Sequence, residues 1–233
     1  MNTEQIQDIY PLSPMQQGML FHSIYSPESG TYVEQTNAEL RGALNINAFA
    51  NAWRKVVERN PILRTAFVWE GVDEPLQVVL NDVDFEIRFE DWREKSPHQQ
   101  QTELQGILEQ DRQSGFVLTE APLMRIMLFQ LQDELFKMVW SHHHLLLDGW
   151  SQPLLMGELL TLYDAFDKNR SIDLPERPEY RQYIDWLEAQ DTTQAEHYWQ
   201  QTLAGFTSPT PLLADYSVMT ETNDYATLTR MLS

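Results

Sequence analysis

The 233-residue chain contains no cysteine. This absence excludes a disulfide scaffold, a cysteine nucleophile and a thiolate metal site, and it suits a reducing compartment, so we expect a cytoplasmic protein. No stretch approaches the roughly 20 uninterrupted apolar residues of a membrane-spanning helix. The first five residues, MNTEQ, have neither the basic region nor the apolar run of a signal peptide, so none is expected there.

Basic residues are few, with 16 Lys and Arg against 35 Asp and Glu and a formal net charge of -19. Such a chain repels nucleic acid and anionic membranes as a whole, so neither is an expected partner. The acidity indicates either a well-solvated surface, the more frequent reason, or attraction for a partner with a basic patch. Apolar residues make up 42% of the chain and aromatic residues 11%, which is typical of a globular protein with a proper core.

Hydrophobic periodicity and turn signals predict an α+β chain with helices packed on a mixed sheet. Ser13 and Ser96 each precede a proline and are followed three residues later by a glutamine, the pattern of a capped helix start. Further helices are predicted from residue 47 to 60 and over 154–166, 180–190 and 194–203. Strands are predicted over 31–40, 62–69, 75–89, 123–131 and 135–142, the last two as a hairpin.

The polar segment 168–178, with two prolines, is the predicted linker. A further strand is predicted over 226–232, where the sequence stops after one more residue. We therefore expect the sequence to be a piece of a longer chain.

Residues 141–151 read SHHHLLLDGWS and contain the most informative pattern of the chain. Imidazole titrates near neutral pH, so it can accept or donate a proton in a reaction. If the strand continues, its period of two places His142 and His144 on one face and His143 on the other. One histidine can then pack in the core while another faces a cleft. Gly149 permits a tight turn that brings backbone N–H groups close to a ligand. We call residues 142–150 the histidine loop.

Two other kinds of site have to be weighed for this loop. His142 and His144 can ligate zinc side by side, but a catalytic zinc needs three protein ligands, and neither cysteine nor an HExxH helix is present. Asp148 becomes a third ligand only if the loop doubles back. A serine hydrolase is disfavoured because the sequence has no GxSxG turn. The sequence therefore predicts no metal.

HHLLLDGWS resembles the HHxxxDGxS signature of condensation domains in nonribosomal peptide synthetases, which share a superfamily with chloramphenicol acetyltransferase. Three further segments resemble motifs of that family, in the family's order. Residues 12–22, LSPMQQGMLFH, are similar to its first motif, and residues 58–67, ERNPILRTAF, to RHxxLRTxF, with Asn60 at the usual histidine. Residues 180–186, YRQYIDW, are similar to YxDYxxW, with Gln182 in place of the aspartate.

The resemblance implies a domain of two acetyltransferase-like lobes arranged as a V, with the active site between them. Residues 1–175 are then the N-terminal lobe with the HHxxxDG loop, and residues 176–233 begin an incomplete C-terminal lobe. The later family motifs are absent. We therefore expect this fragment to carry the catalytic loop but to lack a closed, active site.

The resemblance also implies the reaction, an acyl transfer in which an acceptor aminoacyl thioester's amine attacks a donor peptidyl or aminoacyl thioester. Both substrates are carried on 4′-phosphopantetheine of partner carrier proteins, and the domain itself binds no cofactor. His144 is implied to orient or deprotonate the amine, or to stabilise the tetrahedral intermediate. Gly149 is implied to bring its amide toward the thioester carbonyl or the amine.

The remaining site residues have implied supporting roles. Asp148 belongs to the catalytic motif, but it is expected to pair with Arg64 and so fix the histidine loop. His143 is expected to support the site by packing, and Trp150 is expected to give it structural support. His142, where the family often has methionine, is left unassigned.

The doubled histidine disfavours the cyclising members of the family, which carry DxxxxD here, and the first motif suggests a D-configured donor with an L-configured acceptor. An epimerization domain of the same superfamily is the nearest alternative, and a non-catalytic carrier-protein docking module is another. The expected partners are upstream donor and downstream acceptor carrier proteins and a neighbouring adenylation domain. Since the first motif begins close to Met1, residues 1–25 are a candidate docking element for an upstream synthetase.

Overall fold

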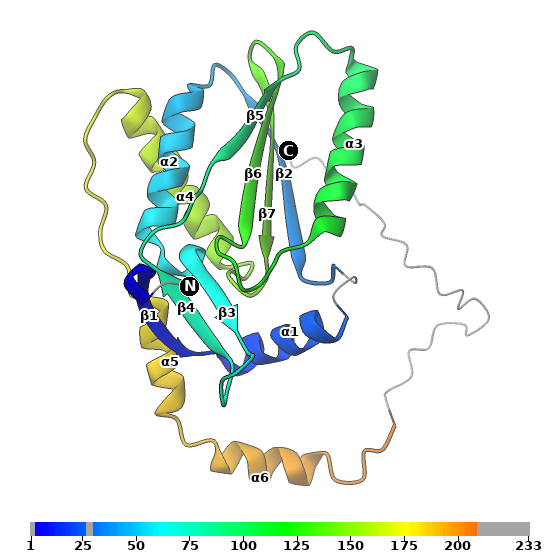
Figure 1. Ribbon diagram of the computed structural model, residues 1–233, viewed down its shortest axis with the longest axis vertical. Coiled ribbons are helices and arrows are strands. Elements are labelled where there is room, and N and C mark those ends of the chain that lie inside the picture. Colours follow the sequence, from blue (N-terminus) through cyan, green and yellow to red (C-terminus); the bar gives the residue numbers. More distant parts are fainter. Residues whose placement is uncertain (1–2, 27–29, 209–233) are drawn as a thin grey trace, which may run out of the picture. The chain divides into compact units, whose positions relative to one another are not determined.

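The computed structural model describes residues 3–26 and 30–208. The chain forms helices and strands in the mixed order expected of an α+β protein (Figure 1). In chain order the elements are η1 (Thr3–Gln5), β1 (Ile6–Pro11), α1 (Pro14–Tyr25), β2 (Val33–Arg41), α2 (Ile46–Arg59), η3 (Pro61–Arg64), β3 (Thr65–Val68), β4 (Leu76–Leu80), β5 (Ile87–Asp91), α3 (Pro97–Ser114), β6 (Met124–Gln132), β7 (Leu135–His143), α4 (Ser151–Asp167), α5 (Tyr180–Glu188) and α6 (Thr193–Thr202).

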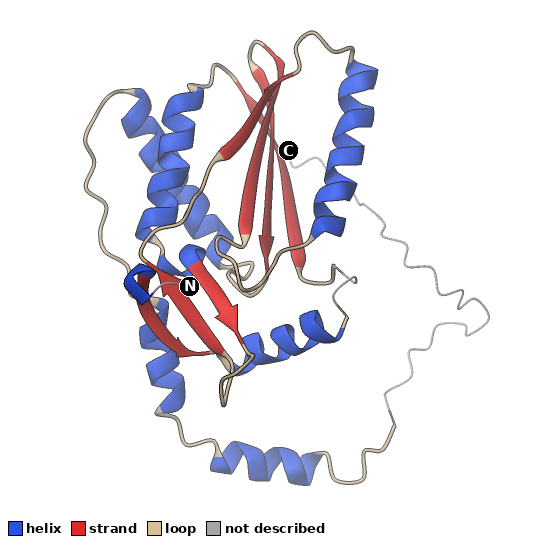
Figure 2. Cartoon of the chain, in the orientation of Figure 1, coloured by secondary structure: helices blue, strands red, loops and turns tan. Residues whose placement is uncertain are grey.

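The strands form two sheets (Figure 2). A small antiparallel sheet has the order β1-β4-β3, and a larger sheet has the order β2-β7-β6-β5. Within the larger sheet β5 and β6 are parallel and the other neighbours antiparallel, so the sheet is mixed as predicted. Strand β7 lies between β2 and β6 and is therefore an inner strand of this sheet.

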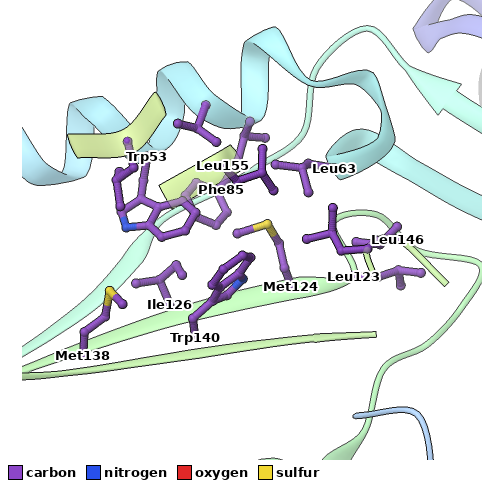
Figure 3. Close-up of a cluster of buried hydrophobic side chains, with 14 of the residues drawn as sticks. Trp53, Leu63, Phe85, Leu123, Met124, Ile126, Met138, Trp140, Leu146 and Leu155 are labelled. Carbon is purple, nitrogen blue, oxygen red and sulfur yellow. The ribbon is translucent and has the colours of Figure 1, made fainter. Parts of the chain in front are cut away.

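Helices cover both faces of the larger sheet, with α2 and α4 on one face and α3 on the other (Figure 1). On the first face, Trp53 of α2 packs edge to face on Trp140 of β7, with ring centroids 5.3 Å apart. Figure 3 shows these two indoles within the cluster that joins the helices to the strands. Burying each such large side chain contributes roughly 2–3 kcal/mol, so this cluster is the main core.

Local signals in the sequence are confirmed where they concern helix starts and the hairpin. The hydroxyls of Ser13 and Ser96 accept hydrogen bonds from the amides of Gln16 and Gln99, and each glutamine side chain bonds back to its serine's amide. The predicted hairpin is present as β6 and β7.

Two strand predictions are wrong in their extent. The strand predicted over 75–89 is two strands, because the chain leaves the small sheet after β4 and enters the large sheet at β5. Its alternating pattern persists between them since Phe85 packs into the main core from the connection. The strand predicted over 62–69 begins with the 3₁₀ turn η3, which has Pro61 at its first position. The strand predicted over 226–232 lies outside the described residues.

The chain divides into two compact units, Met1–Gln190 and Asp191–Ser233. The first contains both sheets and helices α1 to α5, and the second includes α6. Helix α5 follows the predicted boundary at residue 175, yet it packs on the small sheet through Ile184 against Tyr10 and Val79. Assignment of 1–175 and 176–233 to separate lobes stays a prediction. In the described part of the chain, no helix is both long and apolar enough to cross a membrane.

Candidate functional site: the histidine loop

Strand β7 carries the first two histidines into the end of the larger sheet. His142 is paired with Met124 on β6 and with Glu34 on β2, so it is held on both sides. The chain leaves the sheet after His143, and the amide of His144 donates to the carbonyl of Tyr32 at 2.8 Å. The last histidine therefore lies in the turn that follows the strand.

The three adjacent imidazoles have different surroundings. His142 is fully buried, and its ring lies against that of Trp140 at a tilt of 31° with centroids 4.9 Å apart, whereas His143 is nearly fully buried and His144 is half-buried. Burial lowers the pKa of both His142 and His143 to about 4, so these two rings are neutral at neutral pH. Of the three residues, His144 has the most access to solvent, although its Nδ1 is buried and has no hydrogen-bond partner among the described residues.

His143 is fixed by partners at both ring nitrogens. Its Nδ1 accepts a hydrogen bond from the amide of Leu145 at 3.2 Å, and its Nε2 lies 3.3 Å from the hydroxyl of Ser23. Since Nδ1 accepts, the proton of the neutral ring is on Nε2, which donates to Ser23. The Ser23 hydroxyl in turn donates to the carbonyl of Met19. These contacts support the packing role expected for His143; the sequence reasoning missed Ser23.

Asp148 is exposed and caps the start of helix α4. One carboxylate oxygen accepts hydrogen bonds from the amides of Trp150 and Ser151, at 3.1 and 2.8 Å, and from the Ser151 hydroxyl at 2.7 Å. These hydrogen bonds hold the pKa of the Asp148 carboxyl below its usual value, and the bond from the Ser151 hydroxyl has the largest effect. The carboxylate thus satisfies amides that a helix start otherwise leaves without partners.

The predicted ion pair between Arg64 and Asp148 is wrong. The buried Arg64 guanidinium donates to the carbonyls of Val57, Glu58, Leu80 and Asn81 and to the side chain of Gln7. Among the ion pairs of the described residues, none joins Arg64 to Asp148. The physical reason is that backbone carbonyls at the ends of α2 and β4 occupy the guanidinium, while Asp148 is satisfied within its own turn. Arg64 supports the fold, not the loop.

Gly149 and Trp150 lie at the open side of the turn. A Cβ added to Gly149 meets no atom within 4 Å, and its backbone is not in the left-handed region, so within the described chain the turn does not require glycine. Trp150 is 86% exposed, and its backbone amide donates to the carboxylate of Asp148. Structural support of the site by the Trp150 side chain stays a prediction.

A buried glutamine reaches the loop from helix α1. The side-chain amide nitrogen of Gln16 donates to the carbonyl of Leu145 at 3.0 Å and lies against Gln77 of β4. The sequence reasoning gave Gln16 only a capping role and missed Gln77 entirely. The available signal was a glutamine inside the otherwise apolar run LQVVL. Within the described residues, no three His, Asp or Glu side chains are grouped as metal ligands.

The fold is that of solved condensation domains. The starter condensation domain of rhizomide synthetase matches with a TM-score of 0.76 at 20% identity, covering 87% of this chain and 50% of that one. The first condensation domain of the calcium-dependent antibiotic synthetase, in complex with a substrate analogue, matches with a TM-score of 0.74 at 17% identity and the same coverage. The chain therefore has the α+β architecture found in these domains and spans half their length.

Sequence similarity identifies the family of the chain as well as its fold. The Condensation domain family model matches residues 6–230. A linear gramicidin synthase of Brevibacillus parabrevis is 46% identical over 208 residues, which are 89% of this chain and 4% of that protein. Bacitracin synthase 3 of Bacillus licheniformis is 37% identical over 208 residues, 89% of this chain and 3% of that protein. The chain belongs to the condensation domain family.

Proposed function

We propose that this chain is part of a condensation domain that forms an amide bond between two carrier-bound substrates in nonribosomal peptide synthesis. Membership of the family supports this function, as do relatives that are peptide synthases. The observation that carries the assignment of the reactive group is that the residue His144 is half-buried, beside two histidines that are sealed in the interior. A substrate can meet this imidazole without displacing the core.

In the proposed reaction the acceptor's α-amine attacks the carbonyl carbon of the donor thioester. A C–N bond forms, the C–S bond breaks, and the proton lost by nitrogen ends on the departing sulfur. His144 orients the amine, accepts its proton in passing, or stabilises the tetrahedral intermediate, while the Gly149 amide lies toward the reacting groups. A neutral amine is already a nucleophile, so holding two tethered substrates together supplies most of the acceleration.

The proposed partners are donor and acceptor carrier proteins, which present the substrates on 4′-phosphopantetheine, and an adenylation domain. The domain itself binds no cofactor and works in the cytoplasm on a D-configured donor and an L-configured acceptor. A second lobe supplies the other wall of the substrate tunnel, so the 233-residue chain alone is inactive.

The test extends the chain to the full length of its solved relatives and supplies loaded donor and acceptor carriers. We expect His144→Ala to lower the rate of dipeptidyl thioester formation by at least ~100-fold, the usual scale for a group that handles a proton in the transition state. The rate is measured by mass spectrometry of the acceptor carrier. His98→Ala, at an exposed histidine of helix α3, is the matched control and keeps the rate.

Unchanged product in His144→Ala removes the assignment of the reactive imidazole. Inverted stereochemistry of the carrier-bound residue without elongation identifies an epimerase instead. Carrier binding that is indifferent to His144 and to loading, with no product from the unchanged sequence, identifies a docking module.

A further inference from the structure

We propose that Gln16 is a buried positioning residue that holds the carbonyl of Leu145, the residue after His144, and that Gln77 is its buried hydrogen-bond partner. Gln16 lies on helix α1 and Gln77 on strand β4 of the small sheet, whereas His144 follows strand β7 of the large sheet. The pair therefore connects the small sheet and the first helix to the histidine loop. The hydrogen-bond geometry is independent of the proposed function, and only its consequence for the reaction rests on that function.

The two side-chain amides bind each other reciprocally. The nitrogen of Gln16 lies 3.2 Å from the oxygen of Gln77, and the nitrogen of Gln77 lies 2.9 Å from the oxygen of Gln16. The Gln77 nitrogen also donates to the carbonyl of Pro11, and the Gln16 oxygen accepts from the amide of Ser13. The second N–H of the Gln16 side chain donates to the carbonyl of Leu145. A flipped Gln16 amide places oxygen against oxygen there, so the orientation is fixed.

Three hydrogen bonds fix the backbone on both sides of the His144 side chain. The His144 amide donates to Tyr32, and the Leu145 amide donates to the His143 ring. The third bond, from Gln16 to the Leu145 carbonyl, reaches the loop from helix α1. A displacement of about 1 Å at a reacting group can lower the rate by about 100-fold. The hydrogen bond that fixes the backbone next to His144 therefore matters for the reaction.

Burial indicates that the pair has a role beyond filling space. Gln16 is 3% exposed and Gln77 is fully buried. Buried amides contribute little net stability over apolar groups of the same shape, since folding only exchanges water for protein partners. Apolar residues can replace both for packing, but they cannot hold the Leu145 carbonyl.

The test compares Gln16→Met with Gln77→Met in the 233-residue chain, by hydrogen exchange of the Leu145 amide. Both variants put a side chain of similar length in the same buried region, but Gln77→Met leaves the bond from Gln16 to Leu145 in place. After correction for global stability, measured on the amides of helix α3, we expect Gln16→Met to speed Leu145 exchange by about 10-fold. That factor corresponds to a lost hydrogen bond of about 1.4 kcal/mol. Gln77→Met is expected to change the exchange rate of the Leu145 amide by less than about 3-fold.

Equal acceleration in both variants, or none in Gln16→Met, overturns the positioning role. If Gln16→Met does not fold, Gln16→Leu gives the same comparison against Gln77→Leu, because a leucine side chain is apolar and cannot donate to the carbonyl of Leu145. In the extended domain, Gln16→Met is expected to lower kcat with little change in KM for loaded carriers, and Gln77→Met to lower it less. A wild-type domain that makes no product refutes the proposed function, but the exchange result stands independently.

Discussion

His142 and His143 are neighbours whose pKa values are lowered by the same burial, yet they differ in what satisfies them. His143 has a partner at each ring nitrogen. In the described chain neither ring nitrogen of His142 has a hydrogen-bond partner, and the ring lies tilted against Trp140. A buried polar atom without a partner costs about 1–3 kcal/mol, so His142 is a position where the chain gives up stability.

We expect His142→Met to raise the free energy of unfolding by about 2 kcal/mol at pH 7.5, because it removes buried polar atoms and keeps an unbranched apolar side chain. The pH dependence should change as well. With folded pKa values of about 4 and an unfolded value near 6.5, both buried rings stay neutral while the unfolded chain takes up protons. The contribution of the two neutral rings to stability is therefore complete above pH 6.5 and is lost as the pH falls from 6.5 to 4.

Urea unfolding at pH 7.5, 6.5, 5.5 and 4.5 measures both effects. The wild-type chain is expected to lose stability across this window, and His142→Met to lose less, because one of the two buried rings is gone. His143→Met serves as the contrasting variant. It leaves Ser23 and the Leu145 amide without their partner, so it is expected to destabilise the chain at pH 7.5. An unchanged slope in His142→Met contradicts the role of its ring.

At the level of elements, helix α4 begins where the histidine loop ends, and local bonds start it. The carboxylate of Asp148 accepts from the first amides, and its carbonyl accepts from the amide of Ser151 at 3.2 Å. No distant charge is needed to hold this turn. The exposure of Asp148 further means that its loss leaves no buried charge unpaired.

Asp148→Ala is accordingly expected to lower the free energy of unfolding by about 1 kcal/mol, the usual value of a helix N-cap. Asp148→Asn, which keeps an oxygen acceptor, should cost only a few tenths of that amount. Chemical unfolding monitored by circular dichroism measures the two variants. A loss of about 3–5 kcal/mol in Asp148→Ala is the size expected for a broken buried ion pair and contradicts the capping role.

The difference between local contacts and contacts across the fold explains what the sequence could predict. The caps at Ser13 and Ser96 and the hairpin of β6 and β7 depend on residues a few positions apart, so their patterns are readable along the chain. The partner predicted for Arg64 is wrong because the carbonyls that bind it come together only in the folded chain. The histidine loop is recognisable from its motif, but Gln77 contacts Gln16 from 61 residues away, and no local pattern reveals such a contact.

At the scale of the whole chain, helix α5 belongs to the unit that holds both sheets. Ile184 packs against Tyr10 and Val79, and Arg181 pairs with Asp8 of strand β1 at 2.7 Å. The helix therefore covers apolar surface of the small sheet, the sheet that also carries Gln77. A boundary at residue 175 removes this cover.

We expect a chain of residues 1–175 to be less stable than one of residues 1–190 by about 2–5 kcal/mol, the cost of losing a large buried aliphatic contact such as that of Ile184. Urea unfolding of the two truncated chains, followed by tryptophan fluorescence, measures the difference. Ile184→Ala in the longer chain should reproduce much of it. Equal stability of the two truncated chains contradicts a structural role for α5 in this unit.

The position of β7 between β2 and β6 also bears on how the polypeptide matures. Strands β6 and β7 are joined by a tight turn and can zip together as soon as they are made, whereas β2 precedes its β7 partner by about 100 residues. During synthesis, β2 therefore has an edge without its hydrogen-bond partner until β7 has been made, and such an edge favours mispairing. The strand that leads into the turn of His144 is thus also the one that completes the sheet.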